Sequence, residues 1–299
     1  MNRAPLVTVI IPTYNWSEVL PYSIGSVLRQ TFQDFELLVV GDGCTDNSEQ
    51  VVKAQGDNRV RWINLPANTG HQSDPNNEGL RQARGLFIAY LGHDDLWFPH
   101  HLSALVAALN SGADMAFALT EIVGAEEKFK VAAPSNFKYS RGAWIPPTAV
   151  MHKRDQVTAL GGWRHYWELD VDPEIDLWQR LYDAGNKIDF VSRLTAIKFS
   201  ASERPGIYKE RPCDEQKLWF HRIHGEPHLE ANELPVLLAN SFPTARDRFY
   251  TARLRLRRSL KEFFHRPPKQ AKGAALEARR LIKGLQPKSY PDSSQSDQN

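Results

Sequence analysis

The chain has 299 residues, of which 41% are hydrophobic and 24% are charged. This composition excludes a disordered or fibrous class for most of the chain, and it allows one large α/β domain with an extension or two modest domains. The formal net charge of +2 is too small to indicate a partner until it is divided along the sequence.

The charge is concentrated near the C-terminus. Residues 250–283 contain eleven Lys or Arg and two Glu, so this segment has a charge of +9 and the rest of the chain −7. A basic tail on an acidic body predicts contact with an anionic partner such as a membrane surface or nucleic acid. The alternative is a solvated helical face with salt bridges.

Cysteine usage and hydropathy indicate the compartment. Cys44 and Cys213 are the only cysteines, and their separation suits neither a metal-ligand cluster nor a disulfide framework. We expect no signal peptide at the N-terminus, and no apolar run reaches the roughly 18 to 20 residues that span a bilayer. The expected location is the cytoplasm, with a peripheral position at the inner face of the membrane.

Short apolar runs alternate with helix-like stretches over the first 90 residues. The sequence predicts strands over residues 6–11, 35–40, 60–65 and 86–91 with helices between them, the first helix being capped by Ser17. Such alternation is typical of a mostly parallel sheet with helices on both faces. In these sheets, ligands bind at the carboxyl ends of the strands.

The second half of the chain is expected to be more helical. Further strands are predicted over 113–124 and 144–153, and a helix begins at Pro173 and ends at Gly185. From about residue 200 the strand signal fades. A basic amphipathic helix is predicted over 246–264 and a second helix over 274–285, followed by a disordered tail over 286–299.

Polar and aromatic residues follow three of the predicted strands. Tyr14 comes after the first, Asp42 after the second, and Asp94 and Asp95 after the fourth. An aromatic ring can stack on a base, one carboxylate can accept from a base N–H, and a carboxylate pair can bind a ribose and a divalent cation. Taken alone, the stretch "GHDD" is more typical of a strand-end turn and helix cap, but its place beside the other strand ends favours a ligand site.

Four motifs, "VTVIIPTYN", "FELLVVGDGCTDNS", "ARGLFIAYLGHDDLWFP" and "PEIDLWQRL", occur in this order. Together they resemble the family 2 glycosyltransferases of the GT-A fold, over about the first 200 residues. The resemblance implies a GT-A glycosyltransferase domain over 1–200, which is a Rossmann-like α/β domain with a mostly parallel sheet. A helical, basic C-terminal extension over 201–285 and the tail over 286–299 complete the expected organisation.

The resemblance also implies roles for individual residues. Asp42 corresponds to the carboxylate that recognises the base, commonly uracil, and Pro12 and Tyr14 fall in the base-binding loop. Asp95 corresponds to the ligand of a Mn²⁺ or Mg²⁺ cofactor, and Asp94 to the residue that contacts the sugar nucleotide. Glu174 corresponds to the general base that deprotonates an acceptor hydroxyl.

The implied reaction is an inverting transfer of a sugar from a nucleotide diphosphate donor, with a UDP-sugar expected. The acceptor is expected to be a glycan or a lipid-linked glycan, as in polysaccharide and cell-envelope biosynthesis, with a peripheral membrane contact through the basic helix and no nucleic-acid partner. Two alternatives stay open at this point. One is a non-catalytic sugar-nucleotide or glycan-binding protein with a degraded transferase site. The less favoured one is a nucleotidyltransferase, which would need a Gly- and Lys-rich loop after the first strand.

The sequence departs from the family pattern at several positions. Pro173 and Glu174 stand where the family has two acids, so Asp172 and Asp176 remain rival candidates for the base. Where the family often has an Arg before Asn77, this chain has Asn76. A phosphate contact at that position would have to come from elsewhere.

Overall fold

The computed structural model describes residues 3–125, 129–132, 138–241 and 274–285. Its strands are β1 Val7–Thr13, β2 Phe35–Gly41, β3 Val60–Asn64, β4 Phe87–Tyr90, β5 Leu96–Trp97, β6 Met115–Val123, β7 Phe129–Ala132, β8 Val150–Lys153 and β9 Ile188–Phe199. They form one nine-stranded sheet in the order β3-β2-β1-β4-β8-β6-β9-β5, with β7 paired to β6.

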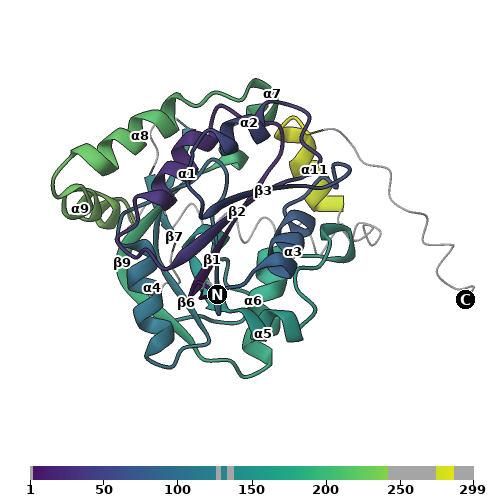
Figure 1. The fold of residues 1–299 in the computed structure, drawn as a ribbon. Coiled ribbons are helices and arrows are strands. Elements are labelled where there is room, and N and C mark those ends of the chain that lie inside the picture. The colour runs from purple at the N-terminus through teal and green to yellow at the C-terminus, as the bar shows by residue number, and fades with distance from the viewer. Residues whose placement is uncertain (1–2, 126–128, 133–137, 242–273, 286–299) are drawn as a thin grey trace, which may run out of the picture.

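Helices cover both faces of this sheet (Figure 1). They are α1 Leu20–Leu28, α2 Ser48–Lys53, α3 Ser73–Gln82, α4 His101–Asn110, α5 Arg154–Ala159, α6 Pro173–Asp183, α7 Ile207–Glu210, α8 Asp214–Gly225, α9 Leu229–Ser241 and α11 Ala274–Ile282. Short 3-10 turns occur at Pro147–Ala149, Tyr166–Glu168 and Ala201–Glu203. Helices α1 and α4 share one core with the sheet, and α3, α5 and α6 share the core on the opposite face.

The near-continuous apolar run of β1 is explained by this double cover. Val7, Val9 and Ile11 face the core of α1 and α4, whereas Ile10 belongs to the core of α3 and α6. A strand buried on both faces needs apolar residues at successive positions, because neither side meets water.

The predicted α/β fold, with a mostly parallel sheet between helices, is confirmed. Strands β1, β2, β3 and β4 pair in parallel, as the β-α-β alternation predicted. Beyond them, β8 runs antiparallel to both β4 and β6, so the second half of the sheet is mixed.

Some local predictions differ from the structure. The prediction that Ser17 caps the first helix is wrong, since α1 begins at Leu20 after Val19 and the Ser17 N–H instead donates to Asp46. Strand β9, which pairs in parallel with β6 and antiparallel with β5, was not predicted.

The C-terminal part was predicted to be helical. Helices α8 and α9 share a core with β5 and β9. The helix predicted over 274–285 is confirmed as α11, while the predicted helix over 246–264 and the tail over 286–299 lie outside the described residues. None of the helices within the described ranges is long and apolar enough to cross a membrane.

Glu121 of β6 is a fully buried acid away from the strand-end loops. Neither of its carboxylate oxygens has a hydrogen-bond partner within the described ranges. Burial, followed by the negative charge of Glu233, raises the pKa of Glu121 to about 8. The folded chain therefore retains this proton over a pH range in which the unfolded chain has released it.

We expect this retained proton to make stability depend on pH. Between about pH 4.5 and 8 the folded state binds one proton more than the unfolded state at Glu121, so the free energy of unfolding falls as pH rises, by at most about 1.4 kcal/mol per pH unit. Urea unfolding at pH 5.5 and 8 should show a smaller pH dependence for Glu121→Gln than for the wild type. Glu49→Gln, at an exposed ion pair with Lys53, is the control. An unchanged pH dependence in Glu121→Gln would contradict the assignment.

Candidate active site

The carboxyl ends of β1, β2 and β4 lie at one edge of the sheet, as expected for parallel neighbours. Thr13 at the end of β1 is in register with Gly41 at the end of β2. The Asp42 backbone N–H donates to the Thr13 carbonyl oxygen at 2.8 Å, and His93 Nδ1 lies 2.9 Å from Thr13 Oγ1. Burial lowers the pKa of His93 to about 4, so a neutral ring joins the loop after β4 to the end of β1.

Asp42, the expected base-recognition residue, is only 4% exposed. Its Oδ1 accepts from the Thr69 backbone N–H at 2.8 Å and from the Thr69 hydroxyl at 2.7 Å, and its Oδ2 accepts from the Gly70 N–H at 2.9 Å. Gly43 has φ +69°, and a Cβ there would lie 2.3 Å from the Asn68 backbone nitrogen. Only glycine allows so close an approach in that conformation. Asp42 thus fixes the neighbouring loop 68–70.

Pro12 and Tyr14, expected in the base-binding loop, are half-buried at and just beyond the end of β1. The next residue, Asn15, has a positive φ of 46°. Its Oδ1 accepts from the Thr45 backbone N–H at 2.7 Å. The loop that carries Tyr14 is therefore tied to the loop that begins at Asp42.

Asp95, the expected metal ligand, is fully buried and contacts three hydrogen-bond donors. Its Oδ1 accepts from the Phe199 backbone N–H at 3.1 Å, and its Oδ2 accepts from the Thr148 hydroxyl and, at 3.2 Å, from Lys198 Nζ. A Cβ at Gly92 would lie 2.6 Å from Asp95 Oδ2, so a larger residue would push this carboxylate out of place.

Lys198 lies among several carboxylates. Burial lowers its pKa, but the negative charges of Asp95, Asp94 and Glu174 act in the opposite sense and leave the pKa above its usual value. Asp94 is 6% exposed, and its carboxylate forms no salt bridge within the described part of the chain. Burial raises the pKa of Asp94. The site therefore contains a protonated Lys198, which donates a hydrogen bond to Asp95. The charges of Asp94 and Glu174 also act on it.

Glu174, the expected base, lies in the first turn of α6 and is 9% exposed. Its Oε1 accepts from Trp144 Nε1 at 3.0 Å, and its Oε2 accepts from Gln72 Nε2 at 3.3 Å. Burial is the main cause that raises the pKa of Glu174, and the nearby charge of Asp172 adds to it. A carboxylate with a raised pKa whose hydrogen-bond donors are neutral has the properties of a general base.

The rival acids have arginine partners. Asp172 pairs with Arg279 at 3.0 Å, and Asp176 pairs with Arg180 at 2.8 Å and with Arg164 at 3.4 Å. The carboxylates of Asp172 and Asp176 are thus already engaged by guanidinium groups, whereas the hydrogen bonds to Glu174 come from the neutral side chains Trp144 and Gln72. This difference favours Glu174 among the three.

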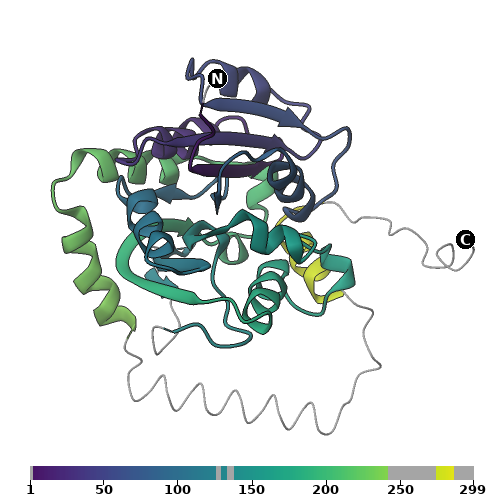
Figure 2. The same ribbon diagram turned by 60° about the horizontal axis from the view of Figure 1, so that its bottom comes forward.

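Helix α11, yellow in Figure 2, packs against the 3-10 turn Tyr166–Glu168. The Tyr166 hydroxyl donates to Glu277 at 3.1 Å, and the Tyr208 N–H donates to the Lys283 carbonyl oxygen at 3.2 Å. Burial lowers the pKa of Lys283, with Lys198 as the next cause. The described end of the basic segment thus supplies a second lysine whose charge interacts with that of Lys198.

The residues expected to bind Mn²⁺ or Mg²⁺ do not fit such an ion as they are arranged. A hard cation needs carboxylate oxygens directed at it, whereas Asp95 directs both oxygens to donors, one of which is the Lys198 ammonium. Within the ranges that the structure describes, no group of three or more His, Cys, Asp or Glu residues could hold a metal ion. The Asp95 carboxylate is therefore bound to Lys198 and two further hydrogen-bond donors.

Four residues of this site were not predicted from the sequence: Lys198, Thr148, Gln72 and Lys283. Lys198 lies at the end of β9, which was not predicted either, and the other three belong to no motif. The stretch LTAIKF over residues 194–199 gave a weak strand signal, but Lys198 is followed by Phe199, so nothing in it marks Lys198 as a strand-end residue.

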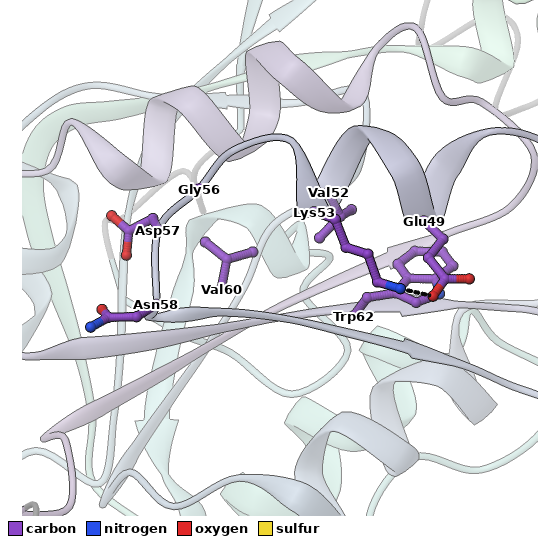
Figure 3. A pocket seen from close by; sticks show the side chains of 8 residues that line it. All are labelled: Glu49, Val52, Lys53, Gly56, Asp57, Asn58, Val60 and Trp62. Carbon is purple, nitrogen blue, oxygen red and sulfur yellow. Dashed lines mark ion pairs between the residues drawn. The ribbon is translucent and has the colours of Figure 1, made fainter.

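A separate pocket lies between α2 and β3 (Figure 3). Its lining residues are Glu49, Val52, Lys53, Gly56, Asp57, Asn58, Val60 and Trp62. None of them belongs to the strand-end loops that hold Asp42 and Asp95 or to the first turn of α6, which holds Glu174. This pocket therefore does not form part of the candidate active site.

Sequence comparison relates the chain to known glycosyltransferases. An uncharacterized glycosyltransferase from Nostoc sp. is 40% identical over 103 residues, which cover 33% of this chain and 31% of the relative. The Escherichia coli UDP-Glc:alpha-D-GlcNAc-diphosphoundecaprenol beta-1,3-glucosyltransferase WfgD is 31% identical over 138 residues, covering 46% of this chain and 54% of WfgD. The chain thus spans about a third to a half of the length of these relatives.

Solved structures share the fold. The complex of Staphylococcus aureus TarS with UDP matches with a TM-score of 0.57 at 20% identity, over 73% of this chain and 63% of TarS. The mannosyltransferase PcManGT from Pyrobaculum calidifontis, in complex with GDP-Man and Mn²⁺, matches with a TM-score of 0.55 at 16% identity, over 94% of this chain and 86% of PcManGT. The family model for glycosyl transferase family 2 matches residues 8–161, just over half of the chain. With the strand-end site and the fold in agreement, the chain belongs to glycosyl transferase family 2.

Proposed function

We propose that this glycosyltransferase moves a sugar from a UDP-sugar to a hydroxyl of a glycan or lipid-linked glycan, with inversion at the anomeric carbon. The observation that carries the proposal is Glu174, a buried carboxylate with a raised pKa, neutral hydrogen-bond donors and no arginine partner within the described residues. A UDP donor is supported by the UDP and UDP-GlcNAc complexes of TarS, and a lipid-linked acceptor by the name of WfgD.

In the proposed reaction, Glu174 takes the proton of the acceptor hydroxyl. The acceptor oxygen forms a bond to the anomeric carbon while the bond from that carbon to the diphosphate oxygen breaks, and this electron pair leaves with UDP. A single displacement of this kind inverts the configuration through a transition state like an oxocarbenium ion. Asp42, Pro12 and Tyr14 are proposed to hold the base, and Asp94 the sugar nucleotide.

Two further expectations have a different status. The expected use of Mn²⁺ or Mg²⁺ is supported by the PcManGT complex, but the contacts of Asp95 do not fit such an ion, so metal use is not part of the proposal and no step of the proposed reaction uses a metal. The basic segment 250–283 is still predicted to contact an anionic membrane surface. The structure describes only residues 274–283 of it, and these do not test the prediction.

The proposal is tested with the purified full chain and a panel of radiolabelled UDP-sugars. Lipid-linked diphosphate glycans serve as acceptors, and both UDP release and labelled product are measured. We expect one donor to give product with the inverted anomeric configuration, read by NMR. Binding of a UDP-sugar without release of UDP under any condition would instead support a non-catalytic binding protein.

Trp144 is expected to tune the proposed base. Its N–H bond to Glu174 is among the contacts that lower the pKa of Glu174, although burial outweighs them. Trp144→Phe should therefore raise the pKa further, shift the acid limb of the pH profile of kcat/KM to higher pH, and lower kcat by about tenfold. Trp62→Phe, which lies in the separate pocket, is the matched control. A pH profile that matches the wild type would show that the Trp144 N–H has no such role.

A further inference from the structure

The position of Lys198 is fixed by the sheet. It lies one residue before the end of β9, and β9 pairs antiparallel with β5, the short strand that follows Asp95 directly. The backbone N–H of Phe199 donates to Asp95 Oδ1, and Lys198 Nζ donates to Asp95 Oδ2. Backbone and side chain of the same strand end thus hold one carboxylate.

The ammonium group of Lys198 has N–H donors that are not directed at Asp95. A lysine ammonium carries three N–H donors, and one is directed at Asp95. About 26% of the Lys198 side chain remains accessible, although Asp95 is fully buried. Lys198 can therefore contact a bound anion without leaving Asp95.

A second cation lies near the same acids. Lys283 follows α11, and its backbone carbonyl accepts from the Tyr208 N–H at 3.2 Å. The charges that act on Lys283 include those of Lys198, Asp94 and Glu174. Lys198 and Lys283 come from distant parts of the sequence, yet their charges act on each other and on the same acids.

We propose that Lys198 is the built-in cation of the donor site: it binds the diphosphate of the donor and neutralises the charge that develops on it, so that donor binding requires no divalent metal. This inference rests on the proposed function and specifies how its leaving group is stabilised. Lys198 supplies the positive charge, Asp95 is the positioning residue that holds it, and Lys283 adds a second charge from α11. The electron pair of the breaking bond leaves on the diphosphate oxygen, which the Lys198 ammonium neutralises.

The contacts of Asp95 distinguish this role from that of a metal ligand. A divalent ion bound by Asp95 would have to displace an ammonium group already at 3.2 Å, together with the Thr148 hydroxyl. Without Lys198, the same buried carboxylate would be open to a cation. Removal of the lysine should therefore create a dependence on metal that the wild type lacks.

The test is the affinity of the full chain for UDP, measured by calorimetry in EDTA and in Mn²⁺. GDP is titrated in parallel in case the base is not uracil. For the wild type we expect nucleotide binding in EDTA that Mn²⁺ does not improve. For Lys198→Ala we expect affinity in EDTA to fall by about 10- to 100-fold and Mn²⁺ to restore much of it. Lys198→Arg should retain most of the affinity in EDTA because it keeps the charge.

Controls separate the possible results. Lys187→Ala removes a lysine that pairs with Asp189 at 2.9 Å on the surface, and it should bind UDP like the wild type. Thermal unfolding and circular dichroism check that each variant is folded, and electron paramagnetic resonance of Mn²⁺ should detect bound metal in Lys198→Ala plus UDP but not in the wild type. Wild-type binding of UDP only with Mn²⁺ would overturn the role of Lys198 and leave the proposed function intact. Failure to bind UDP and GDP under both conditions would overturn both.

Discussion

Glu174→Gln is expected to lower the rate of sugar transfer by about 100- to 10,000-fold, the range for loss of a general base. Gln has the same shape as Glu and can still accept from Trp144 Nε1, so the fold and the packing around position 174 should be kept. It cannot take a proton from the acceptor hydroxyl. The measurements are kcat and kcat/KM for transfer, with UDP affinity expected to stay close to that of the wild type.

Asp172→Asn and Asp176→Asn are the matched controls for this result. Both acids lie in or beside the first turn of α6, and both pair with arginines. We expect each control to keep far more activity than Glu174→Gln. If Glu174→Gln turned over near the wild-type rate while one control did not, the base would have to be reassigned to that acid.

The raised pKa of Glu174 predicts that the rate of sugar transfer depends on pH. Because burial raises the pKa of Glu174 above its usual value, the base becomes protonated, and inactive, at a higher pH than an exposed glutamate. The rate should therefore rise with pH as Glu174 loses its proton. This limb should be absent from the residual activity of Glu174→Gln.

Asp95→Ala is expected to reduce the free energy of unfolding by about 3 kcal/mol and to abolish transfer. The substitution leaves the Lys198 ammonium and the Phe199 N–H without their partner in a buried place, and removal of one member of a buried ion pair typically costs about 3 to 5 kcal/mol. The lower end applies because part of Lys198 remains accessible to water. Urea unfolding measures this loss.

A double variant tests the cause of the instability. In Asp95→Ala with Lys198→Met, the unpaired charge is gone, so stability should recover in part while transfer stays absent. Additive losses in the two single variants would mean that the ion pair between Asp95 and Lys198 contributes nothing to the folded state. Glu49→Ala, which breaks an exposed pair with Lys53, should change stability by less than about 1 kcal/mol.

The early strands were predictable because their signal is local. The runs that form β1, β2 and β4 are apolar at successive positions, and turn residues end each of them. A parallel sheet then places their carboxyl ends at one edge, which is why the sequence alone predicted that Asp42 and Asp95 follow strands that end at the same edge of the sheet. Strand β9 was not predictable in this way. Its twelve residues include Asp189 and Arg193, so it has neither a continuous apolar run nor a regular alternation of apolar and polar residues.

The sequence left three acids as candidates for the base. Asp172, Glu174 and Asp176 lie within five residues, and no local pattern separates them. Their surroundings separate them: arginines contact Asp172 and Asp176, whereas Trp144 and Gln72 contact Glu174. Arg180 lies four residues after Asp176 in α6, so that pairing is local. Arg279, Trp144 and Gln72 come from distant parts of the chain, so the contrast between Asp172 and Glu174 is a property of the folded molecule.

The amino-acid sequence by itself determined the α/β fold, the strand-end positions of Asp42, Asp94 and Asp95, and the resemblance to family 2 glycosyltransferases. Local apolar runs and short motifs are enough for these conclusions. Only the tertiary structure decided what Asp95 contacts, because Lys198 is 103 residues away and reaches it through the pairing of β5 with β9. Contacts of this range depend on the register of a sheet, which local patterns do not specify.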